Sequence, residues 1–132
     1  MMIDFSNEIF DAVAADLRST YEGIKVVGEY VSSPTHFPTV TIDETQNIPT
    51  HLDSAALPKY AEVVYRVQIF CNGVGKRVKA REIYGSVAEQ LSAMGLVGVT
   101  YTTTPAIYNS EIYCITGTFR GVVDRDGMIY RG

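Results

Sequence analysis

The sequence predicts an α+β domain in which a largely antiparallel, mixed β-sheet is flanked by two α-helices. Two stretches carry apolar residues at the helical period, and the segments around them alternate apolar and polar residues as strands do. The strands come in runs joined by short connections, which favours an antiparallel sheet. The expected order is helix, strand, strand, strand, helix, strand, strand. With 132 residues and no internal linker, the chain is expected to form a single domain over residues 1–132.

The first helix is indicated by apolar residues that recur every four positions from Phe5 to Leu17. Ser6 is the expected N-cap, and Phe5 and Phe10 occupy the two positions of a hydrophobic staple. Gly23 is expected to end this helical segment.

The strands are predicted from alternation and from the turn residues between the runs. Their approximate ranges are Ile24–Val31, Pro38–Asp43, Ala61–Phe70, Val97–Thr103 and Glu111–Val123, with a terminal strand at Met128–Tyr130. In the third range every second residue from Ala61 to Ile69 is apolar, so this strand is expected to bury one face.

The second helix is predicted over about Lys76–Met94, with Gly95 as its C-terminal stop. Its buried stripe is expected to contain Ala80, Ile83, Val87, Leu91 and Met94. The first turns carry four cations, Lys76, Arg77, Lys79 and Arg81. Cations there oppose the helix dipole, so local stability does not account for them. They form either a solvated face partly paired with Glu82 and Glu89, or a site for an acidic protein surface or for phosphate.

Residues 44–59 show neither the helical nor the strand period, and we expect a long interaction loop there. Ile48, Leu52 and Leu57 within it need cover, which a neighbouring subunit would supply.

The residues and their spacing predict neither an enzyme nor a cofactor site. The Gly73–Lys76 turn resembles a phosphate-binding loop, but Phe70 and Arg77 replace the glycine and the hydroxyl that such a loop requires. No metal ligands are spaced around the two histidines, His36 and His51, which are both expected in loops.

Other reactive residues also lack a catalytic setting. Asp43 and Glu44 are adjacent, so they are expected on opposite faces of a strand rather than as an acid pair. Cys71 and Cys114 lie in apolar alternating segments, which indicates buried, reduced thiols rather than a disulfide.

The formal net charge of -4 is unevenly divided along the chain. Residues 1–58 contain nine acidic and two basic residues, a balance of -7, whereas residues 59–132 contain nine basic and six acidic residues, a balance of +3. The two signs either mix into an ordinary solvated surface or meet between copies of the chain. No apolar run approaches the roughly 20 residues of a membrane span, and no basic flank of a secretory signal precedes residue 5, so a soluble protein of the cytosol is expected.

Four segments together resemble the neck proteins of tailed bacteriophages. They are Ile3–Phe10, Gly28–Val31 with Pro34 and Phe37-Pro38, Tyr60–Val67, and Ile112–Thr116 with Arg120. The chain is most similar to the tail terminator, or tail completion, family of long-tailed phages and prophages, and the resemblance covers nearly its whole length.

The resemblance implies a structural virion protein without catalytic activity, assembled in the cytoplasm of the bacterial host. In this family a homo-hexameric ring caps the head-proximal end of the tail tube, ends tube polymerisation and joins the head-completion or connector protein. DNA passes through the lumen without specific binding, and an acidic protein suits such a channel because phosphate binding needs the opposite sign. No membrane partner is implied.

Candidate contact residues for the ring and its partners lie in the 44–59 loop, the basic cluster and the C-terminal tail at about 124–132. They are Ile48, Leu52, Leu57, Lys59, Lys76, Arg77, Lys79, Arg81, Arg125 and Tyr130. Two alternatives remain: a head-completion or connector protein nearer the capsid, and, in a different class, a small dimeric ligand-binding α+β domain.

Overall fold

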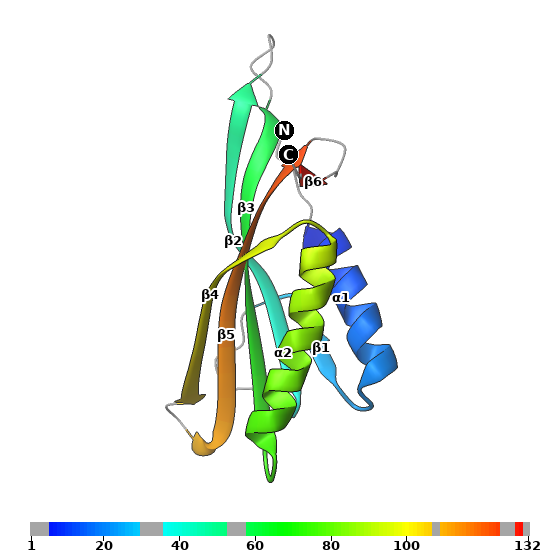
Figure 1. Cartoon of the computed structure of the whole chain (residues 1–132), viewed down its shortest axis with the longest axis vertical. Helices are drawn as coiled ribbons and strands as arrows, with labels where there is room; N and C mark the ends of the chain where they lie inside the picture. Colours follow the sequence, from blue (N-terminus) through cyan, green and yellow to red (C-terminus); the bar gives the residue numbers. More distant parts are fainter. Residues whose placement is uncertain (1–5, 30–35, 53–57, 107–108, 125–128, 131–132) are drawn as a thin grey trace.

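A computed structural model describes residues 6–29, 36–52, 58–106, 109–124 and 129–130 of the chain. Two helices and six strands follow one another in the predicted order, with a short sixth strand at the end (Figure 1). The elements are α1 (Ser6–Thr20), β1 (Lys25–Val27), β2 (Thr39–Leu52), β3 (Pro58–Asn72), α2 (Lys76–Ala93), β4 (Val97–Ala106), β5 (Asn109–Asp124) and β6 (Ile129–Tyr130).

All strands belong to one sheet with the order β1-β2-β3-β5-β4, and β6 pairs with β5. β1 runs parallel to β2, and every other pair is antiparallel. The predicted fold class, a mixed and largely antiparallel sheet with two helices, is therefore confirmed. The C-terminal pairing of Ile129 with Val123 confirms a terminal strand within the expected tail.

Both helices cover the same face of the sheet and contact each other, which leaves a helix-free face on the other side (Figure 1). The predicted alternation in β3 is confirmed, because every second residue from Ala61 to Ile69 is at most 1% exposed and points into the helix-covered core. The helix stripes are confirmed as well. Ile9, Val13 and Leu17 of α1, and Ala80, Ile83, Val87 and Leu91 of α2, are completely buried, while Met94 is half-buried.

Each helix is followed by the glycine that was expected to end it. Gly95 has φ +96°, and the amides of Gly95 and Leu96 donate to the carbonyls of Ser92 and Leu91 as α2 ends. Gly23, with φ +75°, follows α1 as expected. Ser6 is the first residue of α1 rather than its cap, and the staple residue Phe5 lies outside the described residues.

The first predicted strand is shorter than expected, because β1 ends at Val27. Its pairing explains the difference. Val27 pairs in parallel with Thr41, and a parallel partner obliges the chain to leave the sheet and cross back before the next strand starts. Residues 30–31 of the predicted strand lie outside the described residues.

The expected loop at 44–59 is wrong over most of its length. β2 continues to Leu52 and β3 already starts at Pro58, so residues 44–52 and 58–59 pair in a long hairpin. A β-bulge between Glu44 and Gln46 shifts the alternation by one residue, which hides the strand period from a reading of the sequence. The Thr45 hydroxyl donates to the Val64 carbonyl at the bulge (3.2 Å).

The hairpin of β2 and β3 extends past the ends of both helices (Figure 1). We call residues 49–52 of β2 with residues 58–60 of β3 the arm. Leu57 lies outside the described residues. His51, expected in a loop, is part of β2.

Candidate interaction surfaces

The four predicted cations lie together at the start of α2, at the end of the molecule opposite the arm (Figure 1). Arg77, Lys79 and Arg81 are exposed and Lys76 is half-buried. Gly75, with φ +77°, precedes the helix, no side chain caps it, and its first turn contains no acidic residue.

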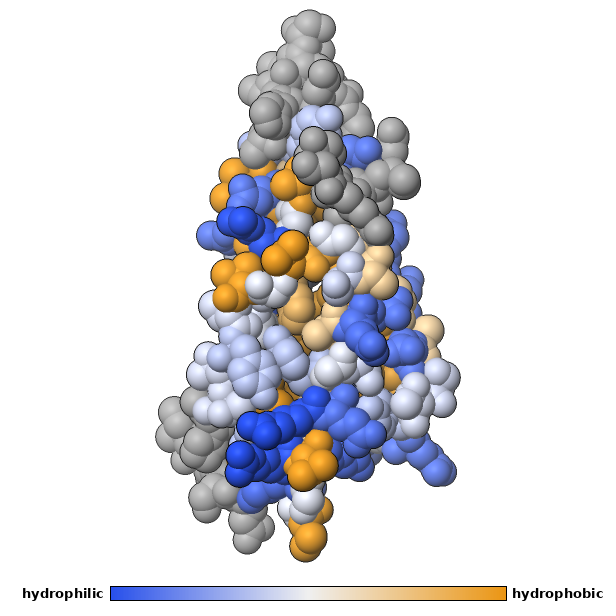
Figure 2. Space-filling view, viewed as in Figure 1, coloured by the Kyte–Doolittle hydropathy of each residue, from blue (hydrophilic) through white to orange (hydrophobic). Residues whose placement is uncertain are grey.

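Two apolar side chains accompany these cations. Val74 is fully exposed in the turn before α2, and Val78 is 70% exposed in its first turn. We call the surface made by Val74, Lys76, Arg77, Val78, Lys79 and Arg81 the basic tip. Figure 2 shows hydrophilic surface around the lower end of α2 with apolar residues at its extremity. Apolar side chains that project beyond surrounding charged residues are typical of a contact with another protein.

A second surface lies on the helix-free face, around the base of the arm. Ile48 is 47% exposed and lies opposite Glu62 in the β2–β3 ladder, and Val97 (66%) and Val99 (57%) are exposed at the start of β4. The β4–β5 register shifts between Gly98 and Thr100, and the extra residue, Val99, lines the same side of the sheet as Val64. We call Ile48, Val64, Val97 and Val99 the outer patch.

The outer patch borders a shallow depression of about 450 Å³ that crosses four strands. Its charged residues form a pair, because Arg120 Nη1 lies 3.7 Å from Glu62 Oε1. Farther down the same face the hydroxyls of Thr100 and Thr118 lie 2.7 Å apart, and Arg66 pairs with Asp43. Exposed valines beside a balanced ion pair form a surface that buries readily against another protein.

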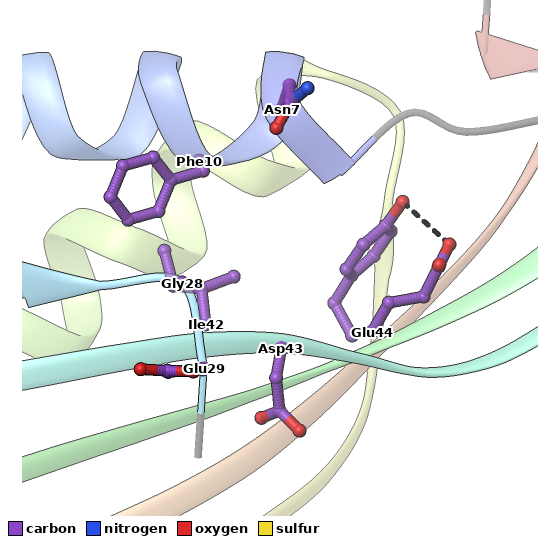
Figure 3. A pocket seen from close by; sticks show the side chains of 8 residues that line it. Asn7, Phe10, Gly28, Glu29, Ile42, Asp43 and Glu44 are labelled. Carbon is purple, nitrogen blue, oxygen red and sulfur yellow. Dashed lines mark hydrogen bonds between the residues drawn. The ribbon is translucent and has the colours of Figure 1, made fainter. Parts of the chain in front are cut away.

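A third site is a cavity of about 500 Å³ between α1, the end of β1 and β2 (Figure 3). We call it the edge pocket, lined by Asn7, Phe10, Gly28, Glu29, Ile42, Asp43, Glu44 and Tyr65. It opens where β2 loses its parallel neighbour, since β1 pairs only as far as Thr41 and no other described strand follows on that edge.

Three acidic residues line the edge pocket, but the carboxylate of Asp43 points away from it. Figure 3 shows Glu44 pointing toward the helices, where the Tyr65 hydroxyl donates to Glu44 Oε1 (3.3 Å), and Asp43 pointing to the other side of β2. Arg66 binds Asp43 through two contacts, Nη2 to Oδ2 at 2.7 Å and Nε to Oδ1 at 3.2 Å. The prediction that Asp43 and Glu44 lie on opposite faces is confirmed. Glu29 is exposed at the rim.

The remaining predicted contact residues are only partly placed by the structure. Leu52 lies at the end of β2, Lys59 in β3 and Tyr130 in β6, but their side chains are not among those described. Leu57 and Arg125 lie outside the described residues. Sequence reasoning missed the edge pocket and Val97 and Val99 of the outer patch, since no local pattern marks them.

Both cysteine thiols are buried and unpaired, as expected. Burial raises the pKa of Cys71 to about 11, although Lys79 lowers it slightly, and burial also raises the pKa of Cys114. His36 donates from Nε2 to the Gly23 carbonyl (2.6 Å). In the described part of the chain, no three His, Cys, Asp or Glu side chains gather closely enough to hold a metal ion.

Within the described ranges, neither helix has the length and hydropathy needed to cross a membrane. No family model matches the chain, and no curated protein matches it. Among solved structures, it is similar to the gp17 protein of bacteriophage SPP1, with 16% sequence identity, coverage of 86% of this chain and 89% of that chain, and a TM-score of 0.36. A TM-score of this size describes a loose likeness in the course of the chain.

Proposed function

We propose that the chain is a structural protein of a bacteriophage virion, and specifically a tail terminator. Six copies form a ring at the head-proximal end of the tail tube. The ring ends tube polymerisation, offers a docking surface to the head-completion or connector protein, and leaves a channel for DNA. Its role is assembly, and no bond is made or broken.

The observation that carries the proposal is the apolar surface that one copy leaves exposed around the base of its arm. Ile48, Val97 and Val99 are 47–66% exposed on the helix-free face, beside a hairpin that extends past the helices. In the part of the chain that the structure describes, no element covers this patch, whereas a neighbouring copy or a tube subunit can cover it. The four segments that resemble the tail terminator family add independent support from the sequence.

The surfaces also suit a ring rather than a two-fold dimer. The basic tip and the outer patch differ in chemistry and lie on different parts of the molecule. A cyclic ring uses two different patches of each subunit, whereas a two-fold dimer uses the same patch twice.

The oligomer is tested by native mass spectrometry and negative-stain electron microscopy of the purified chain over a range of concentrations. We expect a closed oligomer with an axial hole. A compact dimer at all concentrations would contradict the ring and favour the small ligand-binding domain instead.

The step in assembly is tested in a phage whose copy of this gene carries an early stop codon. A missing terminator leaves tail tubes of variable, excessive length, which electron microscopy measures directly. Tails of uniform normal length beside unjoined heads would instead assign the chain to the head-completion ring.

A further inference from the structure

We infer that the basic tip of one copy docks into the edge pocket of a second copy of this chain. The inference rests on the proposed ring-forming function and names the surfaces that would join its subunits. The two surfaces lie at different places on one molecule, so each copy would offer a tip to one neighbour and a pocket to the other.

The edge pocket has the chemistry of an acceptor for a basic, partly apolar segment. Among the described residues, its lining includes Glu29 and Glu44 and no lysine or arginine. The Asp43 carboxylate adds no charge to this side, because it points across β2 to Arg66. Phe10 and Ile42 give it an apolar wall. Gly28 keeps the space beside Phe10 open, because a Cβ there would lie 3.5 Å from the Phe10 ring.

The basic tip has the complementary chemistry. Val74 and Val78 project as apolar side chains, and the four cations surround them at the positive end of the α2 dipole. Cations at this end of a helix are unfavourable in an isolated subunit, and carboxylates from a partner remove that disadvantage. Docking therefore accounts for four cations that the helix itself does not favour.

The charge division of the chain makes a second copy the natural partner. The edge pocket is built from the acidic half, residues 1–58, apart from Tyr65, and the basic tip lies in the basic half. A contact between unlike surfaces of identical chains is heterologous, and it closes into a ring when the rotation between neighbours allows.

The first test reverses each charge pattern at exposed positions only. The tip variant carries Arg77→Glu and Arg81→Glu, and the pocket variant carries Asn7→Lys and Glu29→Lys. For each variant alone, we expect the concentration of half-assembly to rise roughly a hundredfold, because like charges then face each other. An equimolar mixture restores assembly, since copies alternate and each contact again joins opposite charges. Light scattering and native mass spectrometry measure both effects.

The second test locates the contact directly by cross-linking. Val74→Cys and Glu29→Cys are combined in one chain and treated with a bis-maleimide, and we expect a ladder of covalent multimers on a denaturing gel. Each single variant yields dimers at most. The matched control pairs Val74→Cys with Ser92→Cys, an exposed site in the last turn of α2 that belongs to none of the three surfaces. The native thiols are not expected to react with the maleimide, because both are buried. Burial raises the pKa of Cys71 to about 11 and also raises that of Cys114.

The outcomes separate this inference from the proposed function. Wild-type rings combined with unaltered assembly of both charge variants, and no ladder above the control, would overturn the docking and leave the ring intact. A ladder from open chains without closed rings would support the docking and overturn the ring. Loss of assembly in the tip variant alone, with the pocket variant unaffected, would assign the tip to a different surface and also overturn the docking.

Discussion

Tyr84 and Gly117 show how closely α2 packs against the sheet. A Cβ at Gly117 would lie 2.3 Å from Tyr84 Oη and less than 3 Å from two ring carbons, so the tyrosine lies directly over the strand. The Tyr84 ring also meets Tyr101 edge to face, with ring centroids 4.9 Å apart. Burial raises the pKa of Tyr84, with Tyr101 adding to the shift. A glycine on β5 is therefore required for the approach of the helix.

This close approach predicts that Gly117→Ala lowers the free energy of unfolding by about 1–3 kcal/mol, because the ring must move to admit a methyl group. Gly85→Ala is the matched control. Gly85 lies in α2 with no atom within 4 Å of its would-be Cβ, so alanine there should add about 0.5–1 kcal/mol through helix propensity. Urea titrations followed by circular dichroism measure both, and equal effects of the two substitutions would contradict the packing argument.

At the scale of elements, the N-terminus of α2 carries charges that lower the stability of the helix. Its first turn holds Lys76, Arg77 and Lys79 without an acidic residue, and it lacks a side-chain cap. A helix start of this composition is expected where the charge serves a contact outside the helix.

We therefore predict that Arg77→Glu stabilises the isolated subunit by about 0.3–1 kcal/mol while it weakens assembly. Thermal or urea unfolding of dilute, monomeric protein gives the stability, and light scattering gives the assembly. Ser92→Glu, in the last turn of the same helix, is the control and should destabilise slightly, because it places a negative charge at the negative end of the dipole. A loss of stability in Arg77→Glu would show that the cation supports the helix itself.

At the scale of the whole molecule, the fold separates a packed body from an arm. The body buries its core between the two helices and the sheet, whereas the arm continues as two paired strands beyond the helices (Figure 1). Ile48 lies at the base of this extension with nearly half of its side chain exposed. A side chain at such a position contributes little to the stability of its own subunit and more to the contact with a neighbouring subunit.

For this reason Ile48→Lys should leave the midpoint of thermal unfolding of the monomer nearly unchanged and raise the concentration needed for ring assembly roughly tenfold. Ser92→Lys adds the same charge at an exposed site on α2 and should leave assembly unaffected. Analytical ultracentrifugation of the two variants measures the difference. Equal assembly by both variants would show that Ile48, at the base of the arm, is not part of the interface.

Local sequence patterns are enough to predict the helices, their buried stripes, the glycines that follow them, the alternating core face of β3 and the burial of the two thiols. These features depend on residues close together in the chain, where periodicity and backbone preference act directly. The basic tip was predictable for the same reason, since its four cations occupy neighbouring positions in one helix.

The course of β2, the parallel pairing of β1, the apolar outer patch and the acidic edge pocket depend instead on contacts between distant parts of the chain. The bulge after Glu44 interrupts the strand period, and pairing with β3 is what keeps residues 46–52 extended. The edge pocket joins Glu29 to Asp43 and Glu44 across a break in the β1–β2 ladder, and the outer patch joins Ile48 to Val99 across four strands. Such contacts depend on the register between distant segments, which no local pattern encodes.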